Sequence, residues 1–489
     1  MLKQKITNFI FPITYLYAII PILLFFTIWL RWYYAVIAAV LIAYGFIRLC
    51  NNLPDAWKPE LSKKNLKVLL IALAVIIAWV YLSGIGGFVY QNSDHTVRNE
   101  IYEILVNKSW PVIKQVELDG WLKDRGMIYY IAFWLPAALF GKAFGIQAGY
   151  VFQAVWAVIG IWLFYYMICL FLKKISILPL VVFILFSGLD TLGMHIFWSD
   201  TQFLNRSWHI EHWASGFQFS SFTTQLFWVF NQALPLWLFT MLILLQRNNK
   251  QIVFLMGLAV LYGPFPFIGL IPICIVAIFG RRYDGTKGAK NWIISFLKDT
   301  FTIENVLCGG FIGIISYLYL RGNVASQNIE AAAEDINPKG FFFMYIFFFL
   351  LEAGVYFIAV AKNFYKDKFF YAALLSLLVA PLIRIGYSVD FCMRASIPAL
   401  IVLYLMVIRS MYEYKKSKDF IRLAVLIVLF AIGAMTPFRE FDRTFLETRN
   451  LYLDNADIGV EKSEEDNIFI SPNFSGDTED NFFYEKLAR

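Results

Sequence analysis

Residues 148–172 read AGYVFQAVWAVIGIWLFYYMICLFL, an apolar run without a charged side chain. A bilayer core about 30 Å thick needs about 20 mostly apolar residues in each crossing helix. Similar runs recur from Phe9 to Thr436, and 60% of the 489 residues are hydrophobic whereas 16% are charged. Because ordinary soluble domains carry about 25% charged residues, the sequence excludes a soluble globular protein. It predicts an all-α polytopic membrane protein.

Three further patterns are missing from the sequence. The alternating segments of about ten residues that build an outer-membrane barrel are absent. The five cysteines lie at wide spacings without a CxxC pair, so neither a disulfide framework nor a zinc cluster is indicated. No small-residue cleavage site follows the first apolar run, which we therefore expect to remain as a helix.

The distribution of lysine and arginine sets the expected topology. With the N-terminus inside and the C-terminus outside, every short loop predicted inside is basic, as the positive-inside rule requires. The stretch 127–145 contains a proline and a lysine, and as a full span it would place the lysine pair at 173–174 outside. We therefore interpret it as an interfacial or re-entrant helix, and we divide 251–280 at Gly263-Pro264 into two short helices. About thirteen spans are then expected, at residues 9–30, 33–50, 67–84, 148–172, 175–189, 225–246, 251–263, 266–280, 304–320, 341–361, 369–387, 396–410 and 420–436.

All four histidines fall in two polar regions predicted on the outer face, 85–147 and 189–224. In the first of them, Asp94 and His95 closely follow the third expected span. A carboxylate beside an imidazole at the lip of a helix bundle is a candidate general base, because partial burial can raise its pKa toward working pH. The alternative is that Asp94 is the N-cap of a helix over 96–107, since Asp is a favoured cap residue. That helix has an apolar side, and we expect it to lie along the membrane interface.

Further motifs follow that helix in a fixed order. They are Ser109-Trp110-Pro111-Val112, the basic segment 119–130 that ends in two tyrosines, and Leu139-Phe140-Gly141. The order of these motifs resembles that of the GT-C class of membrane glycosyltransferases. In that class an acidic motif is followed by a juxtamembrane helix with a Trp-Pro turn and by a basic, tyrosine-containing segment that leads to Leu-Phe-Gly. The layout is similar in particular to aminoarabinose transferases and protein O-mannosyltransferases. The resemblance covers about residues 67–190.

The resemblance implies roles for several residues. Asp94 matches the acidic residue proposed as catalytic base, and Lys123 or Arg125 stands near the family's basic position before the tyrosines. Asp190, at the end of the fifth expected span, matches a second acidic residue; the alternative is a polar residue that faces water. Asp94-His95 stands where the family often has Asp-Glu, and the family's Lys-Pro-Pro motif is missing from this sequence. Metal use and the type of acceptor therefore stay open. The candidate catalytic residues are Asp94, His95 and Asp190, and the candidate substrate-binding residues of this region are Arg98, Lys123, Arg125 and Tyr129.

The second outer region contains His209, Glu211 and His212, which are ligand types for a divalent metal such as Mg or Mn. Their spacing differs from the HExxH helix motif and does not place three ligands on one face. Glu211 is also a candidate substrate-binding residue. Asp200, Asn205 and Arg206 add further polar groups. The tryptophans among them mark either anchoring at the membrane interface or stacking platforms for sugar rings.

A late segment carries Arg384, Asp390 and Arg394, which we interpret as a phosphate-binding group. Asp390 and Arg394 are four residues apart and can share a helix face. Arginine is suited to bidentate phosphate contacts. The alternative is a structural ion pair, but two cations and one carboxylate leave a positive excess. Glu352, at membrane depth, should face the interior of the bundle.

The expected function is that of an inverting membrane glycosyltransferase. It would transfer a sugar from a polyprenyl-phosphate-linked donor to a glycan, lipid or protein acceptor at the outer face of a bacterial cytoplasmic (inner) membrane. Asp94 would deprotonate the acceptor, and Arg384 and Arg394 would stabilise the leaving phosphate. The alternatives are a flippase or transporter of lipid-linked glycans, a polymerase or ligase of surface polysaccharide, and a non-enzymatic scaffold.

The expected organisation has three parts, and nucleic acid is not an expected partner. Residues 1–66 form an N-terminal helix hairpin and a cytoplasmic loop, and residues 67–436 form the transmembrane catalytic module. Residues 437–489 form an extracytoplasmic tail, which is either a small ordered cap or a flexible end.

Overall fold

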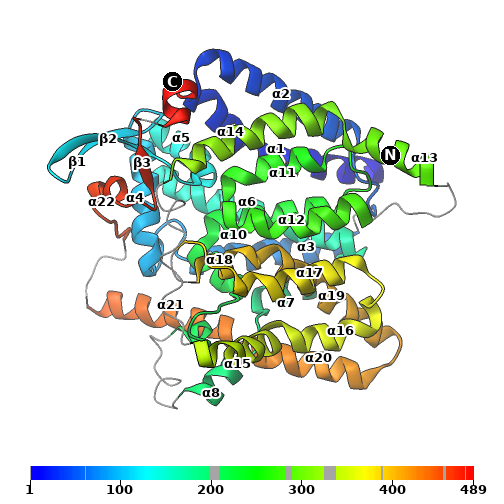
Figure 1. The fold of residues 1–489 in the computed structure, drawn as a ribbon. Helices are drawn as coiled ribbons and strands as arrows, with labels where there is room; N and C mark the ends of the chain where they lie inside the picture. Colours follow the sequence, from blue (N-terminus) through cyan, green and yellow to red (C-terminus); the bar gives the residue numbers. More distant parts are fainter. Residues whose placement is uncertain are drawn as a thin grey trace.

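The computed structural model describes residues 2–60, 62–198, 209–280, 289–323, 338–386, 389–454, 459–479 and 481–489. Figure 1 shows helices that run side by side, with a small β-sheet and short helices gathered at one end. The sequence-predicted residues Asp200, Asn205 and Arg206 lie outside the described residues. The fold is that of a multi-pass helical membrane protein with one small sheet.

Nine helical segments among the described residues are long and apolar enough to cross a membrane. A tenth span arises if Asn291–Thr300 and Glu304–Arg321, bent by 48°, count as one. The nine lie in α1 (Leu2–Trp29), α2 (Trp32–Asn51), α3 (Lys63–Leu82), α6 (Ile146–Leu172), α7 with α8 (Leu178–Leu185, Asp190–Phe197), α10 (Phe222–Leu245), α15 to α16 (Pro338–Phe349, Val355–Phe364), α19 (Ile397–Lys416) and α20 with α21 (Phe420–Gly433, Met435–Leu453).

The other four expected spans correspond to short or bent apolar helices. They are α11 (Ile252–Ala259), α12 (Pro264–Gly280), α14 (Gly310–Arg321) and α17 (Lys368–Val379). The expected break at Gly263 is present, since Pro264 is the first residue of α12. Within 127–145 the chain forms a short 3₁₀ turn and α5 (Leu135–Phe144). The total of thirteen spans and the interfacial position of α5 remain predictions.

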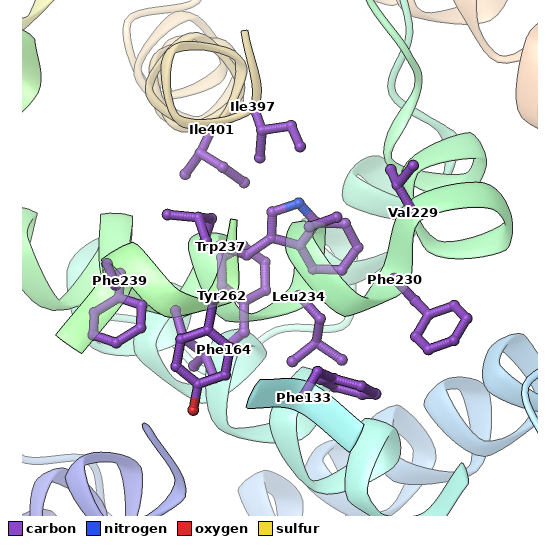
Figure 2. Packing of buried hydrophobic residues seen from close by; sticks show 14 of the residues in the cluster. Phe133, Phe164, Val229, Phe230, Leu234, Trp237, Phe239, Tyr262, Ile397 and Ile401 are labelled. Atoms are coloured by element: carbon purple, nitrogen blue, oxygen red, sulfur yellow. The ribbon is translucent and has the colours of Figure 1, made fainter. Parts of the chain in front are cut away.

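Helix α10 lies at the centre of the bundle. All but three of its residues are buried, and Trp237 donates its indole N–H to Gln225 Oε1 at 2.8 Å. Figure 2 shows Trp237 close to Ile397 and Ile401 of α19, with Phe164 of α6 nearby. The backbone of α10 leaves helical geometry at Val229 (φ −137°, ψ 34°). This kink lies in the turn that follows Phe227 and makes a carbonyl of that turn available to partners outside the helix.

The two ends of the chain lie at opposite ends of the bundle (Figure 1). Arg489 donates its backbone N–H to the carbonyl of Trp29 at 2.9 Å, and Arg31 donates its own to Leu487 at 2.9 Å. Trp29 ends α1, a helix of 28 residues that therefore extends about 42 Å from its first residue. The sides of the membrane on which the two termini lie remain a prediction.

The loops predicted inside contact one another at one end of the helices. Their ion pairs join Arg48 to Glu304 at 2.6 Å, Arg247 to Asp55 at 2.8 Å, and Lys362 to Asp419 at 2.9 Å. Apart from the buried Glu304, the side chains of these pairs are partly or fully exposed, and an exposed ion pair contributes at most about 1 kcal/mol. Each pair shows that the two segments it joins lie together.

The described residues of the tail form an ordered cap, the first of the two alternatives. Residues 113–118 and 121–127 form the antiparallel hairpin β1–β2, and β3 (Ser475–Asp477) pairs with β2. The turn residues Asp119 and Gly120 have φ values of 55° and 79°, a pair that suits a two-residue hairpin loop. Helix α22 (Glu465–Ile470) packs beside the hairpin, where Lys114 pairs with Glu465 at 2.7 Å.

The helix expected over 96–107 is α4 (Ser93–Asn107), and its N-cap is not Asp94. The side chain of Asn92 caps the helix by accepting the backbone N–H of Asp94 at 3.1 Å. Asp94 therefore lies in the first turn with its carboxylate available for another role. Most of the helix is buried, including Arg98, Asn99 and Glu100 on its polar side. Buried polar residues of this kind indicate contacts with the rest of the protein along much of the helix, in addition to any membrane surface.

A cysteine-labelling experiment tests the expected topology. The exposed residues Glu479 and Ser417 lie in the tail and in the α19–α20 turn. In a background in which the half-buried Cys50 is replaced by Ser, we expect Glu479→Cys in intact cells to react with a membrane-impermeant thiol reagent. Ser417→Cys should react only after the membrane is permeabilised. The reverse pattern would place the cap on the cytoplasmic side.

Candidate functional site

A cavity of about 1410 Å³ opens between α4, the start of α10, the helices α11, α12 and α14, and the cap. Its outer end is polar and its other walls are apolar. The tail contributes Asn473 and Phe474 to the outer wall, and Phe474 packs against Tyr129 with ring centroids 5.0 Å apart. The polar residues that line the cavity are Ser93, Asp94, Arg98, Tyr129, Tyr130, His209, His212, Gln218, Thr224, Trp228, Arg321, Asn323, Asp390, Arg394 and Asn473.

Two carboxylate–arginine pairs lie at the polar end. On α4, Arg98 Nη2 donates to Asp94 Oδ2 at 2.8 Å. On the short helix α18 (Asp390–Ala395), Arg394 Nη1 donates to Asp390 Oδ2 at 2.9 Å. Both pairs have an (i, i+4) spacing, so each is held on one helix face. The structure thus brings together four residues that lie about 300 positions apart in the sequence.

The charge state of these groups follows from their surroundings. Burial raises the pKa of Asp94, but the charge and hydrogen bond of Arg98 lower it further, so the net pKa lies below the usual range. Burial lowers the pKa of Arg394, but Asp390 and other neighbours raise it above its usual value. Burial also raises the pKa values of Tyr129 and Tyr130. At neutral pH Asp94 and Arg394 are therefore charged, and Tyr129 and Tyr130 beside them are neutral.

His95 anchors α4 and does not line the cavity. Its Nε2–H donates to the Phe227 carbonyl of α10 at 3.0 Å, and Asn92 Nδ2 donates to the same oxygen at 2.8 Å. Burial and the charge of Arg98 lower the pKa of His95 to about 4, so the ring is neutral. A neutral, buried imidazole that donates to a backbone carbonyl is a positioning group. It fixes the first turn of α4 and hence the place of Asp94.

The apolar arm of the cavity runs along α11, α12 and α14. It is lined by side chains such as Met256, Ile268 and Ile314, and the last two are exposed on the protein surface. Three glycines of the segment 309–313 line this arm, and a Cβ at Gly310 would meet no atom within 4 Å. Lining residues of α14 extend from Gly310 to Tyr317 and Arg321, about 17 Å along the helix. The arm is therefore a long apolar groove that opens onto the membrane-facing surface.

His209 is held between two carboxylates. Its Nδ1 lies 3.1 Å from Glu440 Oε1 and its Nε2 lies 3.4 Å from Glu211 Oε2. Burial lowers the pKa of His209, but the hydrogen bonds and charges of Glu211 and Glu440 raise it to about 10. Burial raises the pKa of Glu211, but His209 lowers it to about 2. The ring is therefore an imidazolium, whose two N–H groups leave no lone pair for a metal ion.

The other candidate metal ligand, His212, lies next to His209, with ring centroids 4.9 Å apart. Burial and the positive charge of His209 lower the pKa of His212. Within the described ranges, no group of three or more His, Cys, Asp or Glu residues is placed to hold a metal. The residues present do not fit the metal site considered from the sequence.

Asp190 lies away from the cavity, in a fully buried cluster with Glu352. Its Oδ2 accepts hydroxyl hydrogen bonds from Ser187 and Thr436, both at 2.8 Å. Glu352 Oε1 accepts the indole N–H of Trp213 at 2.9 Å. As expected, Glu352 faces the interior of the bundle. Asp190 does not line the cavity. Its two hydrogen bonds join the start of α8 to the loop after α7 and to α21.

Three other sequence-predicted residues also lie outside the cavity lining. Lys123 is exposed on β2. Arg125 is buried in the cap, where it donates to Asp477 at 2.9 Å and to Ser475 Oγ at 3.0 Å. The guanidinium of Arg384 lies over the Phe217 ring, 5.2 Å from its centroid. Of the two expected phosphate-binding arginines, only Arg394 lines the cavity; Arg98, expected as a substrate-binding residue, lines it as well.

Several cavity residues were not among the sequence-based candidates. Arg321 ends α14 and lines the cavity. A basic residue at the predicted outer end of a span is an exception to the positive-inside rule, and that exception was the available signal. Trp228 also lines the cavity, and its indole N–H donates to Glu440 at 2.9 Å. Glu440 in turn pairs with His209. Their pairing depends on the packing of α21 against α10, for which the sequence carries no local signal.

Comparisons with known proteins identify no relative: no family model, curated protein or solved structure matches the chain.

The charge of His209 predicts a pH-dependent stability. Its pKa is raised from 6.5 to about 10 in the folded protein, so its contribution is complete below about pH 6.5 and is lost as the pH rises toward 10. We expect His209→Gln to lower the melting temperature of the purified protein most at pH 6.5 and least near pH 10. The exposed His195 supplies the control variant, His195→Gln. A difference for His209→Gln that stays constant over this range would contradict the buried imidazolium.

Proposed function

We propose that the protein is an inverting membrane glycosyltransferase that uses a polyprenyl-phosphate-linked sugar. One observation carries the proposal: a single cavity joins a carboxylate, two buried arginines and an apolar groove along three helices. An isoprenoid chain suits the groove, and a phosphate suits the guanidinium groups. We propose an acceptor on the outer face of a bacterial cytoplasmic membrane.

The charged groups of the cavity suit a proton transfer coupled to loss of a phosphate. In the proposed mechanism, Asp94 takes the proton of an acceptor hydroxyl, and the acceptor oxygen attacks the anomeric carbon. The bond to the lipid phosphate breaks on the opposite face of the sugar, which inverts the configuration. Arg98 and Arg394 stabilise the negative charge of the departing phosphate. Arg98 takes the place that the sequence suggested for Arg384, because Arg98 lines the cavity.

A transporter of lipid-linked glycans is the second candidate. The breaks at Gly263 and at the non-helical turn of α10 favour it, because transporters often bind substrate beside discontinuous helices. The same arginines would bind phosphate, but no general base would be needed. A polymerase or ligase of surface polysaccharide shares the chemistry of the transferase and differs in the acceptor.

The decisive experiment measures chemistry rather than binding. Purified protein is incubated with a panel of polyprenyl-phospho-sugars and candidate acceptors, and sugar-dependent release of the lipid phosphate is followed. Release with inversion at the anomeric carbon is expected of the transferase. Movement of intact lipid-linked glycan between leaflets of a proteoliposome, without release, would favour the transporter.

Asp94→Asn tests the base. Because Asn92 provides the cap, the substitution should leave the start of α4 intact while it removes the proton acceptor. Turnover in the same assay should fall by roughly 10²–10⁴-fold. The matched control is Asp119→Asn, the same chemical change at the exposed hairpin turn of the outer end. An Asp94→Asn protein that transfers sugar at the rate of the control would remove Asp94 from the mechanism.

Arg394→Ala tests the phosphate site. The variant should bind a polyprenyl phosphate more weakly by about 1.5–3 kcal/mol, the value of one charged hydrogen bond. Arg394→Lys should recover only part of that loss, because the planar fork of donors is gone. Isothermal titration in detergent measures both affinities. Unchanged affinity in Arg394→Ala and in Arg98→Ala would show that the headgroup binds elsewhere.

A further inference from the structure

The two arginines of the cavity are only partly satisfied by their carboxylates. Each donates one N–H, from Nη2 of Arg98 and from Nη1 of Arg394. The buried Nε and Nη1 of Arg98 and the buried Nε of Arg394 have no hydrogen-bond partner among the described residues. A guanidinium carries five N–H donors, and a buried donor without a partner costs free energy. Both guanidinium groups therefore carry N–H donors that their carboxylates leave unused, and a further acceptor reaches these buried atoms only when the side chains rearrange.

In both pairs the carboxylate is the more exposed partner. The side chain of Arg98 is 6% exposed and that of Asp94 is 41% exposed. The side chain of Arg394 is 11% exposed and that of Asp390 is 30% exposed. Both carboxylates line the cavity. Each of them already accepts an N–H group that its arginine would otherwise offer to an entering anion. An anion that takes full bidentate contact must compete with them.

We propose that Asp94 and Asp390 occupy the place of the substrate phosphate on Arg98 and Arg394, and that an entering phosphate displaces both carboxylates from these arginines. This inference rests on the proposed function, because the phosphate is that of the lipid donor. Asp390 then acts through Arg394 as a positioning residue that keeps the buried cation neutralised until the donor arrives.

The exchange has a consequence for Asp94. The ion pair with Arg98 makes the Asp94 carboxylate a weak base. The other charged group that bears on it is Arg394, while His95 beside it is neutral. When Arg98 and Arg394 bind the phosphate instead, their positive charges no longer hold the proton affinity of Asp94 low. Asp94 thus becomes an effective base only when the donor is bound. Without the donor it does not take the proton of an acceptor.

Removing a competing carboxylate while keeping its arginine tests the exchange. Full-length protein is titrated in detergent with farnesyl phosphate, with inorganic phosphate and with farnesol. We expect Asp390→Asn to bind farnesyl phosphate roughly tenfold more tightly than wild type, because no carboxylate competes for Arg394. Tighter binding of inorganic phosphate by the same factor would assign the gain to the phosphate alone. Farnesol should bind equally to both proteins, and a gain for farnesol would overturn the proposal.

A matched control separates local exchange from a change in net charge. Asp477→Asn also removes one negative charge from an Asp–Arg pair at the outer end, since Asp477 pairs with Arg125 outside the cavity. Its affinity for farnesyl phosphate should equal that of wild type. Equal tightening in Asp477→Asn and Asp390→Asn, or unchanged or weaker binding in Asp390→Asn, would overturn the exchange.

Two further measurements guard against a folding defect. Asp390→Asn leaves Arg394 without its carboxylate, so farnesyl phosphate should raise the melting temperature of this variant more than that of wild type. Asp94→Asn should independently bind farnesyl phosphate more tightly although it transfers sugar slowly, and weaker binding there would overturn the proposal. Loss of binding in Arg394→Ala without tightening in Asp390→Asn would contradict only the exchange. Unchanged binding in both Arg98→Ala and Arg394→Ala would contradict the phosphate site of the proposed function itself.

Discussion

The position of the candidate base depends on one carbonyl group in the middle of the bundle. The kink of α10 at Val229 makes the Phe227 oxygen available, and it accepts hydrogen bonds from both Asn92 and His95. A regular helix would keep this carbonyl for its own N–H four residues later. The two bonds fix the first turn of α4, and that turn carries Asp94 into the cavity. The kink in the deeply buried helix α10 thus sets the position of Asp94.

Buried charge is the second constraint on this end of the molecule. A cation in a poorly solvated site needs a partner, and here every strongly buried cation of the cavity lining has one. His209 has Glu211 and Glu440, and the arginines have Asp94 and Asp390. The two kinds of pairing differ in what remains available. Both N–H groups of the imidazolium are used, so it stabilises the packing of α21, whereas the guanidinium groups keep free donors for a ligand.

The sequence predicted the helical membrane class and the break at Gly263, because apolar runs and a Gly-Pro pair are local signals. It also offered Asp94, Arg98, Tyr129 and Arg394 among its site candidates, and all four line the cavity, but no local signal indicates that they lie together. The alternative considered for Asp94, the N-cap of this helix, is wrong, because Asn92 and Asp94 are both good cap residues and only the backbone decides between them. The sequence assigned a catalytic role to His95, whose partner is a carbonyl exposed by a distant kink. The hairpin was missed although Asp119-Gly120 is a strong turn signal, and its third strand comes from a tail more than 340 residues later.

That third strand also orders events during synthesis. The outer wall of the cavity includes Asn473 and Phe474, which follow every other lining residue in the chain. Until β3 has paired with β2, the cavity lacks the part of its wall that Asn473 and Phe474 form. The chain must therefore complete its helices before it can enclose the cavity. A ribosome that pauses within the last turns of α21 would leave a chain whose helices are complete but whose cavity is still open beside Asp94 and Arg394.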